Sequence, residues 1–186
     1  MERVFVISGP SGVGKGTLIQ MLTDEFGQDI FLSVSVTTRE QRPGETAGVS
    51  YDYISSEAYA QLLKNGNLLE HAEYAGGCYG SRRCALEALK DHRSVIFEVD
   101  VQGKNQIIRE ITDAVTIFIA PPSMEELRRR LEERGTETLE KIAPRLKKAE
   151  SELAVAEEYQ YRIINDDISG AYKRLRTIYE AETRET

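Results

Sequence analysis

The chain has 186 residues, 40% of them hydrophobic and 30% charged, so it can bury a core and matches the length of one domain of about 100–200 residues. Its formal net charge of −7 argues against a protein that binds nucleic acid. Two cysteines are too few for a disulfide framework, and no apolar stretch approaches the ~20 residues of a membrane span. We therefore expect a soluble, cytoplasmic protein with no nucleic-acid or membrane partner.

Short apolar runs recur along the chain and predict strands. They are continuous rather than alternating, which is typical of strands that are covered on both faces of a sheet. The runs lie at residues 4–7, 95–99, 115–119 and 162–164.

Helical patterns lie between these runs, and the alternation of strands and helices predicts a parallel sheet. Ser123 and Glu126 form a capping box, with Gly135 as the expected end of that helix. Pro144 falls inside a long charged segment, where we expect it to kink or interrupt the helix. The predicted helices span 15–26, 57–64 with Gly66 after it, the segment from 123, 139–159, and 168 to about 180.

The segment from about residue 33 to 82 breaks this rhythm. It contains several glycines, Pro43 and a group of tyrosines, which favour turns over regular strand and helix alternation. We interpret it as a lobe inserted into the α/β domain.

A glycine-rich segment joins the first predicted strand to the first predicted helix. Gly9–Lys15 has the Walker A pattern in the strand–loop–helix context that this motif requires. Its backbone N–H groups and the helix N-terminus suit phosphate oxygens, and Lys15 can reach the β and γ phosphates. The alternative is a glycine-rich turn with a surface lysine. The ATP-binding residues predicted here are Ser11, Gly12, Val13, Gly14, Lys15, Gly16 and Thr17.

One position departs from the general loop pattern. Gly16 stands between Lys15 and Thr17, where a hydroxyl that touches Mg²⁺ usually follows the lysine directly. Either Thr17 supplies that ligand one residue late, or water holds the Mg²⁺ that accompanies ATP. The Gly-Lys-Gly-Thr variant resembles the loop of adenylate kinases.

A second anion site is predicted in the inserted lobe. Arg39 and Arg42 lie three residues apart beside a Pro-Gly turn, and paired guanidiniums can bind one phosphate dianion. Two solvated loop arginines are the alternative, but Tyr51 and the turn Tyr79–Ser81 favour a site. Two phosphate sites in one domain indicate a nucleoside monophosphate kinase.

Several further motifs, in order and at the right spacing, resemble guanylate kinase over essentially the whole chain. The resemblance implies an α/β P-loop kinase fold: a central parallel sheet flanked by helices, an inserted GMP-binding lobe and a helical lid. It also divides a single domain, 1–186, into a core (about 1–32, 83–123 and 160–186), a lobe (33–82) and a lid (124–159). The motifs are Ser33–Arg39, Arg42–Glu45, Tyr79–Gly80, Asp100–Gly103, Arg134–Glu137 and Asn165–Asp167.

The same resemblance implies how GMP is held. Guanine presents N1–H and N2–H₂ donors, which suit a carboxylate such as Glu70, whereas adenine N1 would face it acceptor to acceptor. Without the resemblance, a surface carboxylate beside His71 would be the simpler reading of Glu70. The implied contacts are Arg39, Arg42, Tyr51 and Tyr79 for the phosphate and Ser35, Glu70 and Ser81 for the base, with Glu45, Gly80 and Asp100 also in the GMP site.

Glu98 and Asp100 end the second apolar run, at the sheet edge where ligands of α/β proteins bind. They are expected to position either the water shell of Mg²⁺ or the acceptor. The family usually has aspartate at the first of these positions, so Glu98 is a longer substitute. Cys78 is expected only to pack.

The lid is expected to supply cations for the transferred phosphoryl group. The resemblance assigns this role to Arg134 and Arg145, with Arg130 as a neighbour, so the predicted catalytic residues are Lys15, Arg42, Arg134 and Arg145. Surface ion pairs, Glu125 with Arg129 and Glu126 with Arg130, are the alternative in the lid. Asn165 and Asp166 correspond to the adenine side, although Asp166 or Asp167 could equally cap a helix.

Three functional hypotheses follow. The first is a guanylate kinase that converts MgATP and GMP to ADP and GDP, with activity on dGMP left open. The second is a phosphopeptide-binding module, as in scaffold proteins of similar fold, but those typically lose the phosphate loop that this chain keeps. The third is a kinase for another phosphorylated acceptor, against which Glu70 and Ser35 argue.

Overall fold

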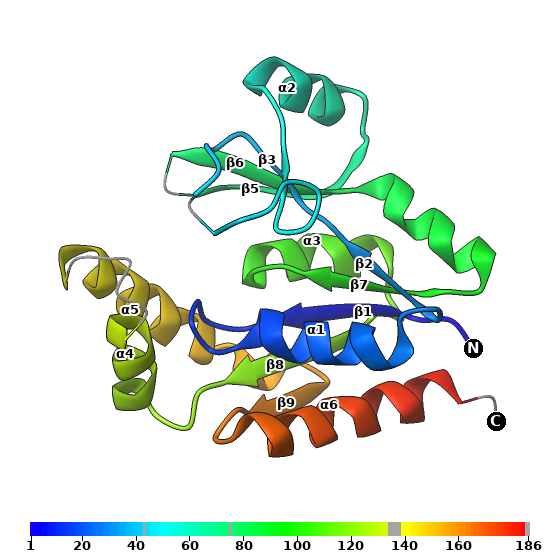
Figure 1. Ribbon diagram of the computed structural model, residues 1–186. Helices are drawn as coiled ribbons and strands as arrows, with labels where there is room; N and C mark the ends of the chain where they lie inside the picture. The colour runs from blue at the N-terminus through cyan, green and yellow to red at the C-terminus, as the bar shows by residue number, and fades with distance from the viewer. Residues whose placement is uncertain (43, 75, 134–138, 185–186) are drawn as a thin grey trace.

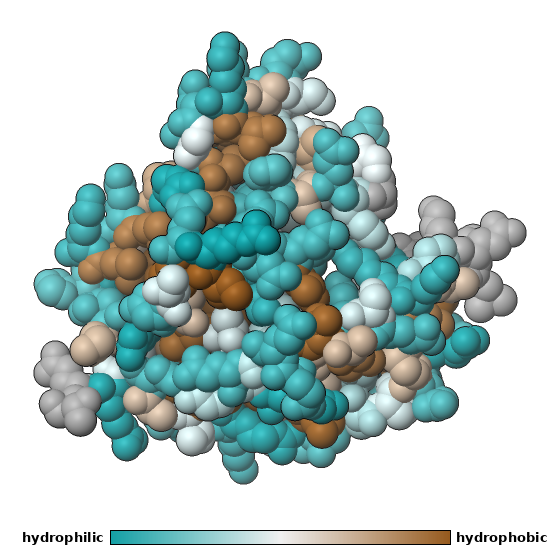
Figure 2. Space-filling model, turned by 180° about the vertical axis from the view of Figure 1, so that it is seen from behind, coloured by the Kyte–Doolittle hydropathy of each residue, from teal (hydrophilic) through white to brown (hydrophobic). Residues whose placement is uncertain are grey.

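The computed structural model describes residues 1–42, 44–74, 76–133 and 139–184. In this part of the chain the strands form a five-stranded and a four-stranded sheet. Figure 1 shows the smaller sheet and one helix as a lobe above the larger sheet and its helices. Seen from behind, the lobe is narrower than the body, and hydrophobic residues gather along one of its flanks (Figure 2).

The five-stranded sheet is parallel throughout, as predicted. The four expected strands are confirmed, and a fifth, β2, pairs at one edge. No strand was predicted for β2, because it is only four residues long and two of them are half-buried. The strand order is β2 (Ile30–Ser33), β7 (Ser94–Glu98), β1 (Val4–Ser8), β8 (Val115–Ala120) and β9 (Tyr161–Ile164).

Both faces of this sheet are buried, which explains its continuous apolar runs. Along β1, Phe5 and Ile7 pack into one core with the helices α1 (Lys15–Phe26) and α6 (Ile168–Thr183). Val4 and Val6 point to the other face and pack with α3 (Val101–Glu110) and the 3₁₀ segment η1 (Arg83–Asp91). Figure 1 shows α1 and α6 side by side in front of the sheet.

Two helices lie at the end of the body below the lobe (Figure 1): α4 (Met124–Glu133) and α5 (Leu139–Leu153). The prediction that Pro144 interrupts α5 is wrong, because it is the sixth residue of a continuous helix and removes a backbone hydrogen bond only near its start. The predicted end at residue 159 is also wrong. The chain leaves the helix after Leu153 and forms a short 3₁₀ turn, η2 (Ala156–Glu158), before β9.

Helix caps agree with the sequence in part. Ser123 Oγ accepts a hydrogen bond from Glu126 N at 3.1 Å, but the Glu126 carboxylate binds Arg129 and Arg130 instead of closing the predicted capping box. Arg129 therefore pairs with Glu126 and Glu133, not with Glu125. The expected helix end at Gly135 lies outside the described residues.

The lobe contains a small mixed sheet and its own core. Its strand order is β4 (Asp52–Tyr53), β3 (Val36–Thr37), β6 (Gly77–Arg82) and β5 (Leu68–Tyr74), and α2 (Ser56–Lys64) covers it. Ser55 caps α2 by accepting from Ala58 N at 3.2 Å, and Gly66 follows the helix in the left-handed region, as predicted. Val36, Tyr59 and Leu68 form the lobe core.

The lobe meets the body mainly where β5 runs against α3. The Gln106 side chain in α3 both accepts from His71 N at 3.1 Å and donates to His71 O at 2.8 Å, as a neighbouring strand would. Residues 33–82 also remain linked to the main sheet through β2, which ends at Ser33. Among the residues described, none of the helices combines the length and the apolarity that crossing a membrane requires.

Candidate active site

A cleft of about 670 Å³ opens between the lobe and the carboxyl ends of β1 and β7. Its walls come from four parts of the chain: the loop after β1, the lobe, the end of β7 and the helix α5. Ligands of parallel α/β sheets bind at this edge. Lys15, Arg39, Arg42, Tyr51, Glu70 and Arg145 all line it, so the structure brings together most of the predicted site.

The phosphate loop is held in a curled conformation that needs glycine. Gly12 and Gly14 have φ of 87° and 98°, a region that disfavours other residues. A Cβ on Gly9 would lie 2.2 Å from Ile119 O of the neighbouring strand. Lys15 Nζ donates to Gly9 O at 2.7 Å and to Pro10 O at 3.1 Å, so the ammonium is kept over the loop. These carbonyls hold the cation where a phosphate oxygen could replace them.

Asn165 supports the loop from behind. Its side chain is buried, and Nδ2 donates to Val13 O at 2.8 Å. The same Nδ2 lies 2.6 Å from where a Cβ on Gly14 would stand, which is a second reason for glycine there. Asp166 is exposed and accepts from Asp167 N and from Arg174, while Asp167 caps α6. The predicted contacts of Asn165 and Asp166 with adenine stay a prediction.

Arg145, one of the predicted lid cations, reaches the phosphate loop. Its Nη1 is 3.5 Å from Ser11 Oγ, and its side chain lines the cleft. Arg130 is held by Glu126 at 2.8 Å and donates to Asn165 O at 3.0 Å, so it ties α4 to the turn behind the loop. Arg134 lies outside the described residues.

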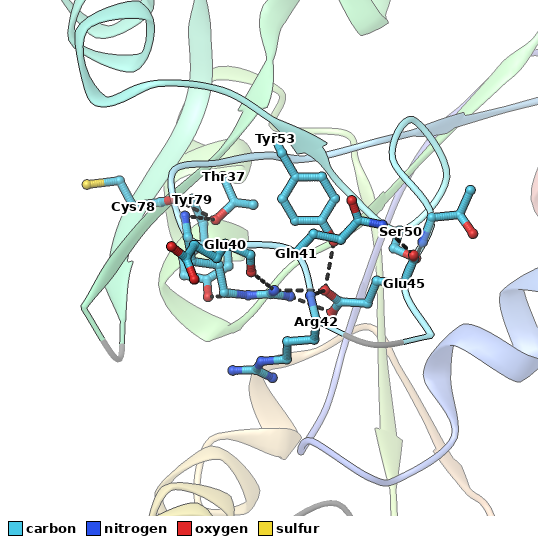
Figure 3. Close-up of polar contacts among 11 residues, drawn as sticks. Thr37, Glu40, Gln41, Arg42, Glu45, Ser50, Tyr53, Cys78 and Tyr79 are labelled. Carbon is cyan, nitrogen blue, oxygen red and sulfur yellow. Dashed lines mark hydrogen bonds and ion pairs between the residues drawn. The ribbon is translucent and has the colours of Figure 1, made fainter.

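Arg39 is fixed by a network in the lobe (Figure 3). Its two terminal nitrogens donate to Glu45 at 2.5 and 2.8 Å, and Nε donates to Tyr79 Oη at 3.1 Å. The guanidinium also lies 5.0 Å from the centre of the Tyr51 ring. Glu45 accepts from Tyr53 Oη at 2.7 Å as well. The hydrogen bonds from Arg39 are the main cause that lowers the pKa of Glu45 to about 2.

Arg42 is placed differently from Arg39. Its backbone N–H donates to Glu45 at 2.8 Å, while Figure 3 shows its guanidinium extending away from the network. The side chain lines the cleft. The site thus combines Arg39, whose guanidinium is held in place, with Arg42, whose guanidinium is directed into the cleft.

The cleft also contains a buried carboxylate. Glu70 is only 5% exposed, and Ser81 Oγ donates to it at 2.7 Å. Ser35 Oγ lies 3.5 Å from Ser81 Oγ, so the two predicted hydroxyls and the carboxylate form one row. Burial, with a smaller effect of the Asp100 charge, raises the pKa of Glu70 above its ordinary value of 4.5.

Two glycines shape the space around Glu70. Gly80 is buried in β6, where a Cβ would lie 2.9 Å from Glu70 O, so it acts in strand packing and does not face the cleft. Gly103 in α3 faces the carboxylate itself: a Cβ there would lie 2.9 Å from Glu70 Oε2. The sequence motif Asp100–Gly103 includes this glycine, but it does not predict the contact with Glu70, because that contact depends on the packing of α3 against β5.

Asp100 joins the sheet edge to α3 and α5. Oδ1 accepts from Gln102 N and Gly103 N, both at 3.0 Å, and so caps α3. Oδ2 accepts from Lys148 Nζ of α5 at 3.0 Å. Lys148 lines the cleft and Tyr53 binds Glu45, and sequence reasoning missed both, because a lysine in a charged helix and a tyrosine in a segment rich in turns carry no distinctive pattern.

Oxygen ligands suitable for a metal are few. Thr17 is exposed at the start of α1, and Glu98 Oε1 is 3.9 Å from Lys15 Nζ; both line the cleft. No group of three or more His, Cys, Asp or Glu side chains within residues 1–42, 44–74, 76–133 and 139–184 could hold a metal ion. In this part of the chain, the protein does not form a metal cage of its own.

Comparison with known proteins identifies the family of this chain. The sequence model described as guanylate kinase matches residues 1–182. The guanylate kinase of Clostridium perfringens (strain SM101 / Type A) is 43% identical over 96% of this chain and 83% of its own length. That of Streptococcus pneumoniae (strain ATCC BAA-255 / R6) is also 43% identical, over 96% and 86%. The crystal structure of guanylate kinase from Anaplasma phagocytophilum superposes with a TM-score of 0.80 at 35% identity, over all of this chain and 88% of that one. The chain therefore belongs to the guanylate kinase family, and its activity is the ATP-dependent phosphorylation of GMP.

Proposed function

We propose that the cleft binds both substrates at once, with the ATP phosphates on residues 9–17 and GMP against the lobe. The observation that carries this placement is that Lys15, Arg42 and the buried Glu70 line one continuous cleft. Such an arrangement holds a donor phosphate, an acceptor phosphate and a base in a fixed order. Positioning of this kind supplies much of the catalysis in phosphoryl transfer.

Arg39 and Arg42 bind the GMP phosphate together with the hydroxyls of Tyr51 and Tyr79. The Glu45 carboxylate and Tyr79 already fix the Arg39 guanidinium, so little side-chain entropy remains to be lost when phosphate binds. Arg42 then adds a charge-assisted hydrogen bond to the same dianion. Arg39 thus provides a rigid contact with the GMP phosphate, and Arg42 provides an adjustable one.

Glu70 selects guanine. Its ionised carboxylate accepts from guanine N1–H and N2–H₂ as well as from Ser81 Oγ, and the hydroxyl of Ser35 can donate to O6. Asp100, beside Glu70, offers a further acceptor to the base edge. Adenine, with a ring acceptor at N1, leaves the buried carboxylate without the two donors that guanine brings, which is costly in a desolvated site.

Cations around the loop stabilise the transferred phosphoryl group. Lys15 comes from the loop, Arg42 from the lobe and Arg145 from α5, so they approach from three sides. Arg134, predicted from the sequence to act with them, belongs to the same proposal. These charges neutralise the negative charge that spreads over the phosphoryl oxygens in the transition state.

Mg²⁺ is proposed as the metal that accompanies ATP. The Thr17 hydroxyl and the Glu98 carboxylate are hard oxygen ligands beside the loop, and a Cβ on Gly16 would lie 4.0 Å from Glu98 Oε2. Mg²⁺ commonly keeps several waters and takes only one or two protein ligands besides phosphates, which fits this sparse set. The metal would supply charge neutralisation of the phosphates.

The free thiols of Cys78 and Cys84 suit a reducing compartment, which supports the proposed cytoplasmic location. Activity on dGMP is left open.

Substitution of Lys15 tests the placement of ATP. Lys15→Met should reduce turnover with GMP by at least about 100-fold, as for loss of a transition-state charge contact, while the far-UV circular dichroism spectrum stays unchanged. Lys173→Met, which alters an exposed lysine on α6, serves as the matched control and should keep wild-type turnover. A folded Lys15→Met variant with full activity would contradict the proposed role of the loop.

A further inference from the structure

Lys148 is a cleft residue of α5 to which none of the sequence motifs gives a role. Its ammonium contacts three different parts of the protein. It donates to Asp100 Oδ2 at 3.0 Å, lies 4.2 Å from the centre of the Tyr74 ring and is 3.8 Å from Glu152 Oε1. Asp100 belongs to the sheet edge and Tyr74 to β5 of the lobe, so one side chain links α5, the body and the lobe.

The contact with Asp100 is well defined. Lys148 is two-thirds covered, with a side-chain exposure of 34%, and Asp100 is covered to a similar degree at 27%. Burial, the largest single effect, opposes the charge of the lysine, but Asp100 together with Glu152 and Tyr74 outweighs it, so the pKa of Lys148 is raised. The ammonium is therefore charged at neutral pH, and the ion pair is more shielded from solvent than an ordinary surface pair.

Asp100 has both of its oxygens engaged by this arrangement. Oδ1 is occupied by the first turn of α3, and Oδ2 by Lys148. A carboxylate oxygen has two lone-pair sites, so Oδ2 can accept one further hydrogen bond while Lys148 stays bound. Lys148 thus fixes the rotation of the carboxylate and leaves one acceptor site for a ligand.

The same contact affects Glu70. Asp100 caps α3, and Gly103 in the first turn of α3 lies directly against the Glu70 carboxylate. Burial and, to a smaller degree, the Asp100 charge raise the pKa of Glu70. Lys148 is therefore placed to hold Asp100, whose carboxylate caps the helix that packs against Glu70.

We propose that Lys148 is a positioning residue for the acceptor nucleotide: it orients Asp100 toward GMP and ties α5 to strand β5 of the lobe. This inference rests on the proposed placement of GMP against the lobe. Helix α5 then acts on both substrates: Arg145 contacts the phosphates of ATP, and Lys148 supports the site of GMP.

Steady-state kinetics of Lys148→Met test this role, with the neighbouring exposed Lys147→Met as the matched control. We expect Lys148→Met to raise KM for GMP about tenfold, as for loss of a partly buried ion pair, while kcat and the Kd of ATP measured without GMP change less than ~3-fold. Lys148→Arg, which keeps the charge, should restore KM for GMP. Lys147→Met should match the wild type in all of these values.

A double-mutant cycle with Asp100→Asn distinguishes positioning from direct contact. If Lys148 acts through Asp100, adding Lys148→Met to Asp100→Asn should change KM for GMP less than ~2-fold. A full effect in the Asp100→Asn background would show a direct contact with substrate and overturn the inference. The inference would also be overturned if KM for GMP were the same in Lys148→Met and Lys147→Met. It would be overturned as well if Lys148→Met weakened the binding of ATP and GMP equally and lowered the melting temperature. Absence of GMP turnover in the wild type would instead contradict the proposed function itself.

Discussion

At the scale of single residues, Glu70 keeps a carboxylate in an environment that disfavours its charge. Within the described residues, the hydrogen bonds to its side chain come from Ser81. An ionised group with so few partners gains most from a ligand that brings two N–H donors, and guanine is such a ligand. We therefore propose that selectivity for GMP follows from this incompletely satisfied acceptor rather than from the shape of the whole cleft.

Substitution of Glu70 by glutamine should separate acceptor binding from donor binding. Glu70→Gln places an N–H₂ group against guanine donors, and loss of two charge-assisted hydrogen bonds of about 1.5 kcal/mol each predicts a rise in KM for GMP of about 100-fold. KM for ATP should change little. An equal loss for both nucleotides in steady-state kinetics would show that Glu70 supports the fold instead of reading the base.

The raised pKa of Glu70 predicts a pH dependence of GMP binding. As the pH falls through this raised pKa, Glu70 binds a proton and loses an acceptor for guanine, so KM for GMP should rise on acidification. The GMP phosphate also titrates near a pH of about 6, so Glu70→Gln, with the same phosphate but no carboxylate, is the control. An identical pH profile in the two proteins would contradict the assignment.

The same shift carries a prediction about stability. The pKa of Glu70 is higher in the folded protein than in the unfolded chain. At a pH between these two values, the folded protein keeps the proton and the unfolded chain has released it. The contribution of Glu70 to the stability of the fold therefore falls as the pH rises through this range. Glu70→Gln should therefore keep or raise the melting temperature at pH 7, which separates its kinetic defect from misfolding.

At the scale of elements, the site depends on how closely α3 approaches β5. Gly103 permits this approach, since a Cβ would lie 2.9 Å from both Glu70 Oε2 and Val99 Cβ. Relief of that overlap requires α3 or the carboxylate to shift, because Val99 Cβ is attached directly to the backbone. The packing of one helix thus sets the position of the base-reading side chain.

Gly103→Ala tests this dependence. Overpacking of this kind costs about 1–3 kcal/mol, so we expect a lower melting temperature and a KM for GMP raised about tenfold, with KM for ATP unchanged. Gln102→Ala, one residue earlier and exposed, is the control and should match the wild type. Wild-type KM for GMP in Gly103→Ala would mean that Glu70 does not need its observed position.

The elements also show what the sequence could predict. The continuous strands and α1 follow from local periodicity, and the phosphate loop from its glycines, whose φ angles exclude other residues. The edge strand β2 carried too little pattern to be found. Lys148 contacts Asp100, 48 residues earlier in the chain, and Tyr53 contacts Glu45 across an irregular segment, eight residues earlier; neither contact leaves a local sequence pattern.

At the scale of the whole molecule, the lobe stands above the body (Figure 1), and we propose that the two hold different substrates. Gln106 and His71 join them at one point, and Lys148 and Tyr74 at another. The core strands order the phosphate loop, and the lobe sheet orders Arg39 and Glu70. Phosphoryl transfer needs these two sets at a fixed separation, so the links between lobe and body are as important to the reaction as the contacts within each.

The central claim is that the acceptor site, with Glu70 at its buried end, accepts GMP and rejects other nucleoside monophosphates. The most direct test is a coupled assay of ADP release with ATP and, in separate reactions, GMP, AMP, CMP and UMP. We predict kcat/KM for GMP at least about 100-fold above that for each of the others, since each leaves the buried carboxylate without matching donors. Turnover of AMP equal to that of GMP, or no turnover of GMP by the folded protein, would contradict the account.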